Sequence, residues 1–397
     1  MNQEHDPELY ANYLRQCLSE DKRPIGLFLG AGCPMAVRVN RGGKDEPLIP
    51  DIWGMTTRIE EILEKSPIKD AYAKLCEHFK KDGVSKPNVE GLLTHVRSLK
   101  QVAGTEEVRG LSASNLEALD KLICDSLVNI AKCSLPKTKT PFHQLATWVG
   151  AIQRSQPVEL FTTNYDLLLE EALELHRVPY FDGFVGADSA FLDLQAMEED
   201  KLPSRWGRLW KIHGSLNWFQ DSDGSVRRAR ITGGERVVIY PSHLKYDESR
   251  RMPHLAMIDR LRAFLRNKAC VLITCGYSFG DDHLNEVCVQ GLQGNSTASI
   301  FALLFGDLNG YGPLVKLAAT RANLNAFAKD AGIIGTRSAA WARGRPASGV
   351  QDSLAVKWLA DATNPGVKNA SFTLGDFARL AEFIEDLTGD RQRSIGA

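Results

Sequence analysis

The chain has 397 residues, of which 43% are apolar and 24% are charged, a composition typical of folded globular proteins and not of disordered ones. Its 48 basic and 49 acidic residues give a formal net charge of −1, so no overall positive field attracts nucleic acid. No apolar run reaches the roughly 18 residues of a membrane span, and the N-terminus lacks a secretory pattern. We therefore expect a cytoplasmic protein that contacts neither membranes nor nucleic acid directly.

The first predicted elements are an amphipathic helix and a buried strand. Asp6 and Pro7 are typical of a helix start, and apolar residues then recur at helical spacing up to Leu18. The apolar run 25–29 has strand length and ends directly in Gly30-Ala31-Gly32. From about 55 to 152 the periodicity is helical again, which predicts a helical insertion.

The rest of the chain alternates strands with helices. Strand-like runs occupy 158–162, 209–212, 237–240, 269–274 and 299–304, and helix-length segments occupy 165–175, 254–266 and 281–292. Because most of these strands lack polar alternation, we predict a doubly wound α/β fold with a Rossmann-like parallel sheet covered on both faces. We place a catalytic domain at 1–309 and a C-terminal extension, mostly helical, at 310–397.

The glycine turn is the first candidate for a functional site. Glycines between a strand and a helix let backbone N–H groups approach a diphosphate closely. The full G-x-G-x-x-G pattern is incomplete because position 35 is Met35, so a plain tight turn is an equally good interpretation.

Two further candidates follow predicted strands, at the sheet edge where ligands bind in open α/β folds. Asn164 is placed to bond a ribose hydroxyl or a water and Asp166 to accept from a carboxamide, although either could simply cap the next helix. His213 follows the strand 209–212 with Gly214 beside it, and an imidazole there is able to act as a general base or to serve a structural role.

The fourth candidate is the loop after the most apolar strand. Gly276 and Ser278 are placed to face a ribose or a phosphate. Asp281, Asp282 and His283 come next, and we interpret the two acids as ordinary charge complements of a helix N-terminus, not as metal ligands.

The order of these motifs resembles the successive NAD-binding motifs of the sirtuin fold, and in particular the bacterial sirtuin-like NAD-cleaving domains of anti-phage defence. The resemblance implies that Gly30, Ala31 and Gly32 hold the diphosphate of NAD. It also implies that Thr163, Gly276 and Ser278 line the nucleotide site.

The same resemblance assigns the chemistry. Asp51 and Trp53 would lie on a mobile loop over the nicotinamide, and Asp166 would read its carboxamide. Asn164 would bind the ribose and position the attacking water, and His213 would act as the base.

The sequence departs from sirtuin deacylases in the segment after the histidine motif. These enzymes carry a zinc ribbon with two C-x-x-C pairs there, whereas residues 216–269 contain no cysteine, which excludes a tetrathiolate zinc site. With the helical insertion as a second departure, we expect water and not a peptide as the acceptor.

The expected activity is therefore NAD hydrolysis to nicotinamide and ADP-ribose, in a defence effector that depletes NAD in infected bacteria. The alternatives are an NAD-dependent protein deacylase or ADP-ribosyltransferase, and a non-catalytic sensor of NAD or ADP-ribose. Because unregulated NAD hydrolysis is toxic, we also expect a homo-oligomer and a separately encoded partner such as an ATPase or helicase-like protein.

Overall fold

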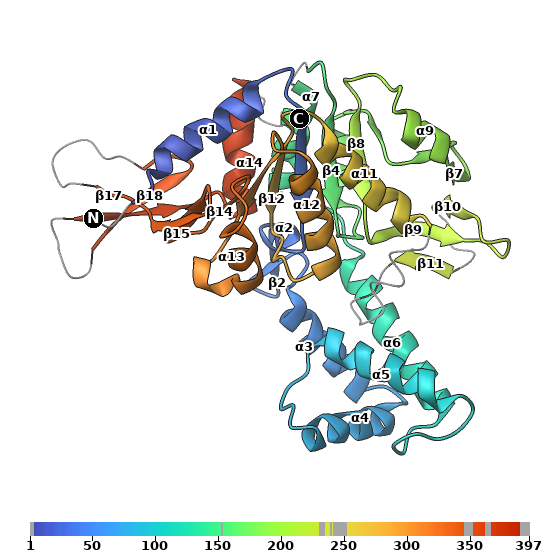
Figure 1. Ribbon diagram of the computed structural model, residues 1–397. Coiled ribbons are helices and arrows are strands. Elements are labelled where there is room, and N and C mark those ends of the chain that lie inside the picture. The colour runs from blue at the N-terminus through green and yellow to red at the C-terminus, as the bar shows by residue number, and fades with distance from the viewer. Residues whose placement is uncertain are drawn as a thin grey trace.

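A computed structural model describes residues 4–151, 154–229, 235–238, 240, 252–344, 352–361 and 367–389. Its centre is a nine-stranded sheet in the order β16-β15-β14-β13-β12-β1-β4-β8-β5 (Figure 1). The strands from β14 to β5 are parallel. They are β1 (Ile25–Leu29), β4 (Val158–Thr162), β5 (Tyr180–Phe181), β8 (Gly207–Lys211), β12 (Val271–Cys275), β13 (Ser299–Leu303) and β14 (Leu324–Phe327).

Helices cover both faces of this sheet, as the apolar strands predicted. One face packs against α1 (Pro7–Ser19), α7 (Pro141–Ala151), α8 (Leu168–Leu175) and α14 (Phe377–Glu385), and the other against α11 (His254–Arg266), α12 (Asp282–Gly294) and α13 (Gly312–Ala318). Every residue of β1, β4, β8 and β12 is buried. Burial on both faces explains why these strands lack polar alternation, and the predicted α/β class with a Rossmann-like parallel sheet is confirmed.

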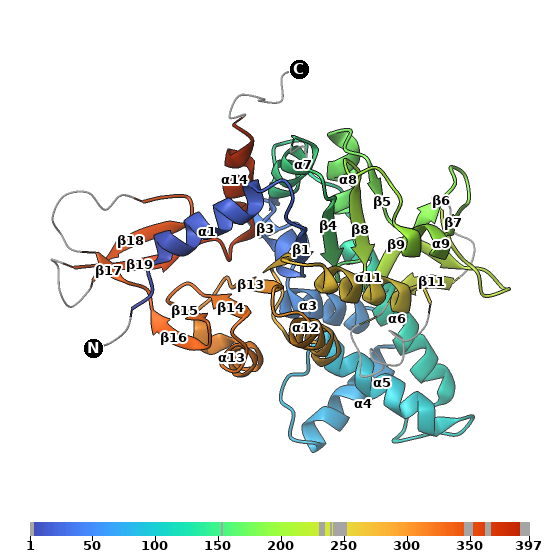
Figure 2. The same cartoon turned by 45° about the horizontal axis from the view of Figure 1, so that its top comes forward.

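A second, antiparallel sheet has five strands, two that precede β8 in the chain and three that follow it. It contains β6 (Phe184–Val185), β7 (Ala190–Leu192), β9 (Gly214–Gln220), β10 (Val226–Arg228) and β11 (Glu235–Val238), with α9 (Leu194–Glu199) beside it. The strand predicted at 237–240 corresponds to β11, which begins two residues earlier, and position 239 lies outside the described residues. Figure 2 shows this sheet next to β5 and β8.

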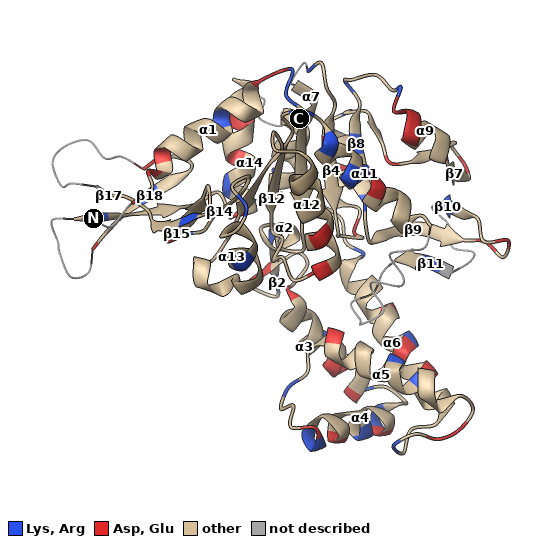
Figure 3. Ribbon diagram, in the orientation of Figure 1, with Lys and Arg blue, Asp and Glu red and all other residues tan. Residues whose placement is uncertain are grey.

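The predicted helical insertion is present as a separate group of four helices, which we call the helical unit. It consists of α3 (Ile52–Glu64), α4 (Lys69–Lys81), α5 (Val89–Ala103) and α6 (Ala113–Ala131), packed around its own apolar core. Figure 1 shows it beyond the ends of the central strands, and Figure 3 shows acidic and basic residues interspersed along its helices. Helix α7, which also falls within the predicted range, packs instead against α8 and α14 of the main body.

The C-terminal region differs from the prediction of a mostly helical extension. Strands β14, β15 (Ala331–Ile334) and β16 (Arg337–Ala340) extend the central sheet past residue 309, and β17 (Arg343–Gly344), β18 (Val356–Ala360) and β19 (Lys368–Phe372) form a further sheet. The prediction failed because these strands are five residues or fewer, and apolar runs that short cannot be told from helix by periodicity.

Two smaller elements complete the description. A short antiparallel pair, β2 (Arg38–Arg41) and β3 (Lys44–Pro47), connects the first strand to the helical unit. No helix within the described ranges has the length and apolarity required to cross a membrane.

Candidate functional site

The strand order reverses beside β1, which lies between β12 and β4. The chain runs from β1 outward through β4 to β8, and then returns to β12 on the other side of β1. In open parallel sheets, ligands bind outside the carboxyl ends of the strands at such a reversal. We call this end the carboxyl edge, and all four candidate motifs follow strands that finish there.

The glycine turn packs directly against the loop that follows β12. The Gly30 N–H donates to the Cys275 carbonyl and the Gly32 N–H to the Gly276 carbonyl, each at 2.9 Å. A Cβ on Gly32 would lie 2.8 Å from the Gly276 Cα, and one on Gly30 would overlap the Gly276 backbone. The glycines are thus required for contact between two loops, and their N–H groups are already occupied.

The remaining donor of the turn is Ala31, which is exposed. Within the described part of the chain, its N–H makes no hydrogen bond. The helix that follows, α2 (Gly32–Met35), is a single turn, so it contributes little dipole to this position. On the opposite loop, Gly276 has φ +66°, and a Cβ there would lie 2.7 Å from the Cys33 nitrogen.

Asn164 is held by the carboxyl ends of two neighbouring strands. The Thr162 hydroxyl donates to the Leu29 carbonyl at 2.7 Å and accepts the Asn164 N–H at 3.0 Å. The Asn164 Nδ2 donates to the Gly30 carbonyl at 3.0 Å. The Asn164 amide is therefore tied to the glycine turn, with half-buried Thr163 beside it. The sequence analysis did not single out Thr162, which fixes this loop.

Asp166 lies at the start of α8 and is 6% exposed. Its Oδ1 accepts the Leu168 N–H at 3.1 Å in a local turn, whereas the N-cap position of α8 is Leu167, which has no side-chain cap hydrogen bond. Burial raises the pKa of the carboxyl to about 6, while the positive charge of Lys211 opposes the rise. Asp166 is thus engaged within the fold next to Asn164.

His213 follows β8, the strand next to β4. Its Nε2 lies 3.5 Å from Oδ2 of Asp281, and both side chains are 15% exposed. Behind it, the buried imidazole of His254 approaches the Ile212 carbonyl with Nδ1 at 3.1 Å. Burial lowers the pKa of His254 to about 4, so at neutral pH it is uncharged and its Nδ1–H donates to that carbonyl.

Asp281 is the site residue that the sequence analysis interpreted only as a charge complement of a helix N-terminus. Its Oδ1 does accept the Leu284 N–H at 3.1 Å at the start of α12, but its Oδ2 faces His213. No local signal brings these two residues together, because 67 positions separate them along the chain. A carboxylate against an imidazole orients the ring.

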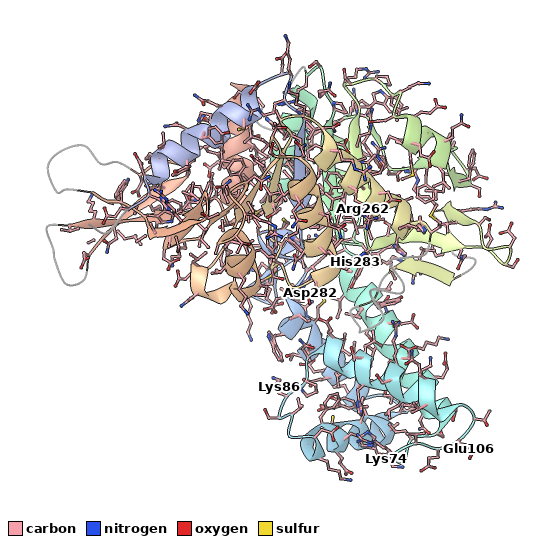
Figure 4. The ribbon with its side chains drawn as sticks, in the orientation of Figure 1. Lys74, Lys86, Glu106, Arg262, Asp282 and His283 are labelled. Atoms are coloured by element: carbon pink, nitrogen blue, oxygen red, sulfur yellow. The ribbon has the colours of Figure 1, made fainter. Side chains whose placement is uncertain are left out.

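The loop from β12 to Asp281 has a fixed shape. Asn285 lies beneath it, donating from Nδ2 to the Phe279 carbonyl at 2.8 Å and accepting from the Tyr277 hydroxyl at 3.0 Å. Ser278 is exposed. Figure 4 shows Asp282 and His283 at the start of α12, on the side of the main body that faces the helical unit.

Asp51 and Trp53 lie at the beginning of α3. Asp51 Oδ1 accepts the Gly54 N–H at 2.8 Å and caps the helix, and Trp53 is 48% exposed. Among the described residues, neither side chain makes a hydrogen bond to the loops that carry Asn164 and His213. The structure therefore brings together the glycine turn, Asn164, Gly276 and His213, and it leaves Asp51 and Trp53 as helix-start residues.

Within the described ranges, no three His, Cys, Asp or Glu side chains form a group able to hold a metal ion. All eight cysteines are free. Burial raises the pKa of the Cys33 thiol beside the glycine turn well above its usual value, so this thiol is protonated at neutral pH.

The fold and the edge residues define an α/β protein with a polar site at the reversal of a Rossmann-like sheet. Residues 158–332, from β4 into β15, match the SIR2-like domain family, a stretch that includes Asn164, His213 and Gly276. Sirtuin-like proteins use NAD, so this match supports NAD-dependent enzymatic activity. A comparison with curated proteins finds no match to the chain.

Proposed function

We propose that this protein is an NAD hydrolase, which cleaves the bond between nicotinamide and ribose to give nicotinamide and ADP-ribose. The observation that carries the proposal is the pairing of β4 with β8. The Ile212 N–H donates to the Thr162 carbonyl at 2.8 Å, so Asn164 and His213 leave neighbouring strands at the same level of the carboxyl edge. An amide and an imidazole there can hold a ribose and a water.

The glycine turn would bind the diphosphate in a modified way. Because Gly30 and Gly32 donate to the Cys275 and Gly276 carbonyls, the Ala31 N–H, which has no partner among the described residues, is the donor of this turn that remains for a phosphate oxygen. Thr163, Gly276 and Ser278 would line the nucleotide site.

The nicotinamide end of the site would use Asp166, Asp51 and Trp53. Asp166 would read the carboxamide, and the first turn of α3 with Asp51 and Trp53 would cover the ring. In this arrangement the catalytic domain extends from the N-terminal helix to at least β13, and the C-terminal residues complete its sheet.

The proposed reaction has two parts, the loss of nicotinamide from C1′ and the addition of water to C1′. Nicotinamide leaves C1′ with the electron pair of the glycosidic bond, and the ribose develops oxocarbenium character. Asn164 positions a water below C1′, and His213 accepts the proton that this water loses as its oxygen bonds to C1′. A positioned base of this kind contributes about 10²–10⁴ to the rate. Oδ2 of Asp281 faces the imidazole and orients it.

Water is the acceptor in this proposal because residues 216–269 contain no cysteine and hence no sirtuin-type zinc ribbon to help form a peptide cleft. The resemblance to defence-associated domains extends the proposal to an effector that depletes NAD in infected bacteria. Its control would come from homo-oligomer formation and a separately encoded partner such as an ATPase or helicase-like protein.

The test compares nicotinamide release by the wild type, Asn164→Ala and His213→Ala, each with the protein encoded by the neighbouring gene. We expect both variants to lose turnover, and His176→Ala, at the end of α8, to retain it. Wild-type rates in either site variant would refute the assignment. Formation of acyl-ADP-ribose with an acyl-lysine peptide would favour a deacylase, and intact NAD with measurable affinity would favour a sensor.

A further inference from the structure

A buried lysine lies next to the carboxyl edge. Lys211 is the last residue of β8, two positions before His213, and only 1% of its surface is exposed. Its ammonium donates to Oε1 of Glu170 at 2.8 Å and to the Asp166 carbonyl. Because β8 lies beside β4 (Figure 2), the ammonium connects the strand that precedes His213 to the loop that carries Asn164.

The end of β4 and the loop after it are tied to residues 211–216 at three points. The Ile212 N–H donates to the Thr162 carbonyl at 2.8 Å. The Leu216 N–H donates to the Tyr165 carbonyl at 2.9 Å. The third point is the lysine ammonium at the Asp166 carbonyl, and it alone is made by a side chain. The position of this loop therefore depends on which residue stands at 211.

The same ammonium carries a positive charge toward the Asp166 carboxyl. Burial raises the pKa of this carboxyl to about 6, the charge of Lys211 opposes the rise, and the charge of Glu170 adds to it. Three further titratable groups near Asp166 are neutral at this pH because burial raises their pKa values: the Cys33 thiol on α2, the Cys133 thiol after α6 and the Tyr165 phenol. Lys211 and Glu170 are thus the charges that act on Asp166 near neutral pH.

Stability alone does not account for a lysine at this position. Apolar residues of similar volume can often replace a buried ion pair without loss of stability, because they avoid the cost of removing charges from water. We propose that Lys211 is a positioning residue of the site, whose ammonium fixes the loop that carries Asn164 and keeps the Asp166 carboxyl ionised at neutral pH.

The consequence for the reaction is a dependence on pH, and this part rests on the proposed function. An ionised carboxylate only accepts hydrogen bonds, whereas a protonated carboxyl also donates. The N–H groups of a carboxamide therefore require the ionised form of Asp166. We expect nicotinamide release to fall as the pH drops through about 6, the pKa of this carboxyl in the wild type.

The first experiment needs no NAD. It measures the free energy of unfolding in urea between about pH 5 and pH 8 for the wild type and Lys211→Met, each with and without Asp166→Asn. Without the ammonium, the pKa of Asp166 should rise further, so its charged form should cost more stability as the pH increases. We expect the loss caused by Lys211→Met to grow with pH, and to grow less in the Asp166→Asn background. A loss that is equal at every pH, or that Asp166→Asn leaves unchanged, would overturn the proposal.

The second experiment follows nicotinamide release against pH. We expect the acidic limb of the profile to move up by at least about one pH unit in Lys211→Met. Glu170→Gln keeps an acceptor for the lysine and removes a charge that raises the pKa of Asp166, so its limb should move down. The control is Lys201→Met, an 80% exposed lysine that also pairs with a glutamate, and it should keep the wild-type profile.

Opposite shifts separate this role from damage to packing, which lowers the rate without moving the limb in two directions. A limb that stays in place, or that moves the same way in Lys211→Met and Glu170→Gln, would rule the role out. Where Lys211→Met does not fold, the direction of the shift in Glu170→Gln decides. A wild type that releases no nicotinamide would count against the proposed function alone, and the unfolding experiment would still decide the role of Lys211.

Discussion

Asp281→Asn changes the charge that faces His213 and preserves the cap of α12. In the wild type, Oδ1 of Asp281 accepts the Leu284 N–H at 3.1 Å and Oδ2 lies 3.5 Å from His213 Nε2. Asparagine is about as good an N-cap as aspartate, so α12 is expected to begin at the same residue. The substitution therefore isolates the carboxylate that orients the imidazole.

The size of the effect follows from the burial of the pair. Both side chains are 15% exposed, so solvent screens their interaction only in part. At 3.5 Å the contact is longer than a normal hydrogen bond, so we take only the lower end of the range for charged partners, about 1.5 kcal/mol, and about 1.4 kcal/mol corresponds to a factor of ten. We expect the rate of nicotinamide release to fall about tenfold.

The assay measures nicotinamide release across the pH range, with Asp282→Asn as the matched control because Asp282 is the exposed neighbour in the same helix turn. Asp281→Asn should lose rate while its melting temperature stays close to that of the wild type. A wild-type rate and pH profile in Asp281→Asn, or an equal loss in Asp282→Asn, would refute the role given to this carboxylate.

Three further predictions concern stability. Gly276→Ala should lower the free energy of unfolding, measured in urea, by about 2–5 kcal/mol, because φ at this position is +66° and the new Cβ would meet the Cys33 nitrogen. A loss below about 1 kcal/mol would contradict this. Burial depresses the pKa of His254 to about 4, so the free energy of unfolding of the wild type should fall by up to about 3 kcal/mol as the pH falls from 6.5 toward 4. His254→Gln should lose less stability over the same range. Parallel curves of unfolding free energy against pH for the two proteins would disprove it. Burial raises the pKa of Asp166 from 3.8 to about 6, so its charged form costs stability that builds up as the pH rises between these values. Asp166→Asn should therefore melt above the wild type at pH 7 and lose that advantage by pH 4, and a lower melting temperature at pH 7 would be evidence against this account.

The sequence predicted best the elements that are defined by a continuous local pattern of apolar residues. The apolar run 25–29 and the helix 254–266 have the predicted bounds, because a fully buried strand and an amphipathic helix each leave a continuous pattern. The sequence also predicted that Asn164 and His213 each follow a strand at one edge of the sheet, and the structure adds that these strands, β4 and β8, are neighbours.

What the sequence did not predict depends on contacts between distant segments. Gly30 and Gly32 fit a phosphate turn equally well whether their N–H groups are free or bonded to the Cys275 and Gly276 carbonyls, and only the packing of β12 beside β1 decides this. Asp281 and His213 meet only because α12 starts beside the end of β8. The C-terminal strands were missed because four-residue pairs such as β15 and β16 depend on the neighbouring sheet and not on their own pattern.

The central claim is that NAD is consumed at the carboxyl edge by Asn164 and His213. The most direct measurement is chromatography of NAD and its products after incubation with the wild type and with His213→Ala, in the presence of the protein encoded by the neighbouring gene. The account predicts equal amounts of nicotinamide and ADP-ribose from the wild type and intact NAD from the variant. Intact NAD in both, or equal product in both, would contradict it.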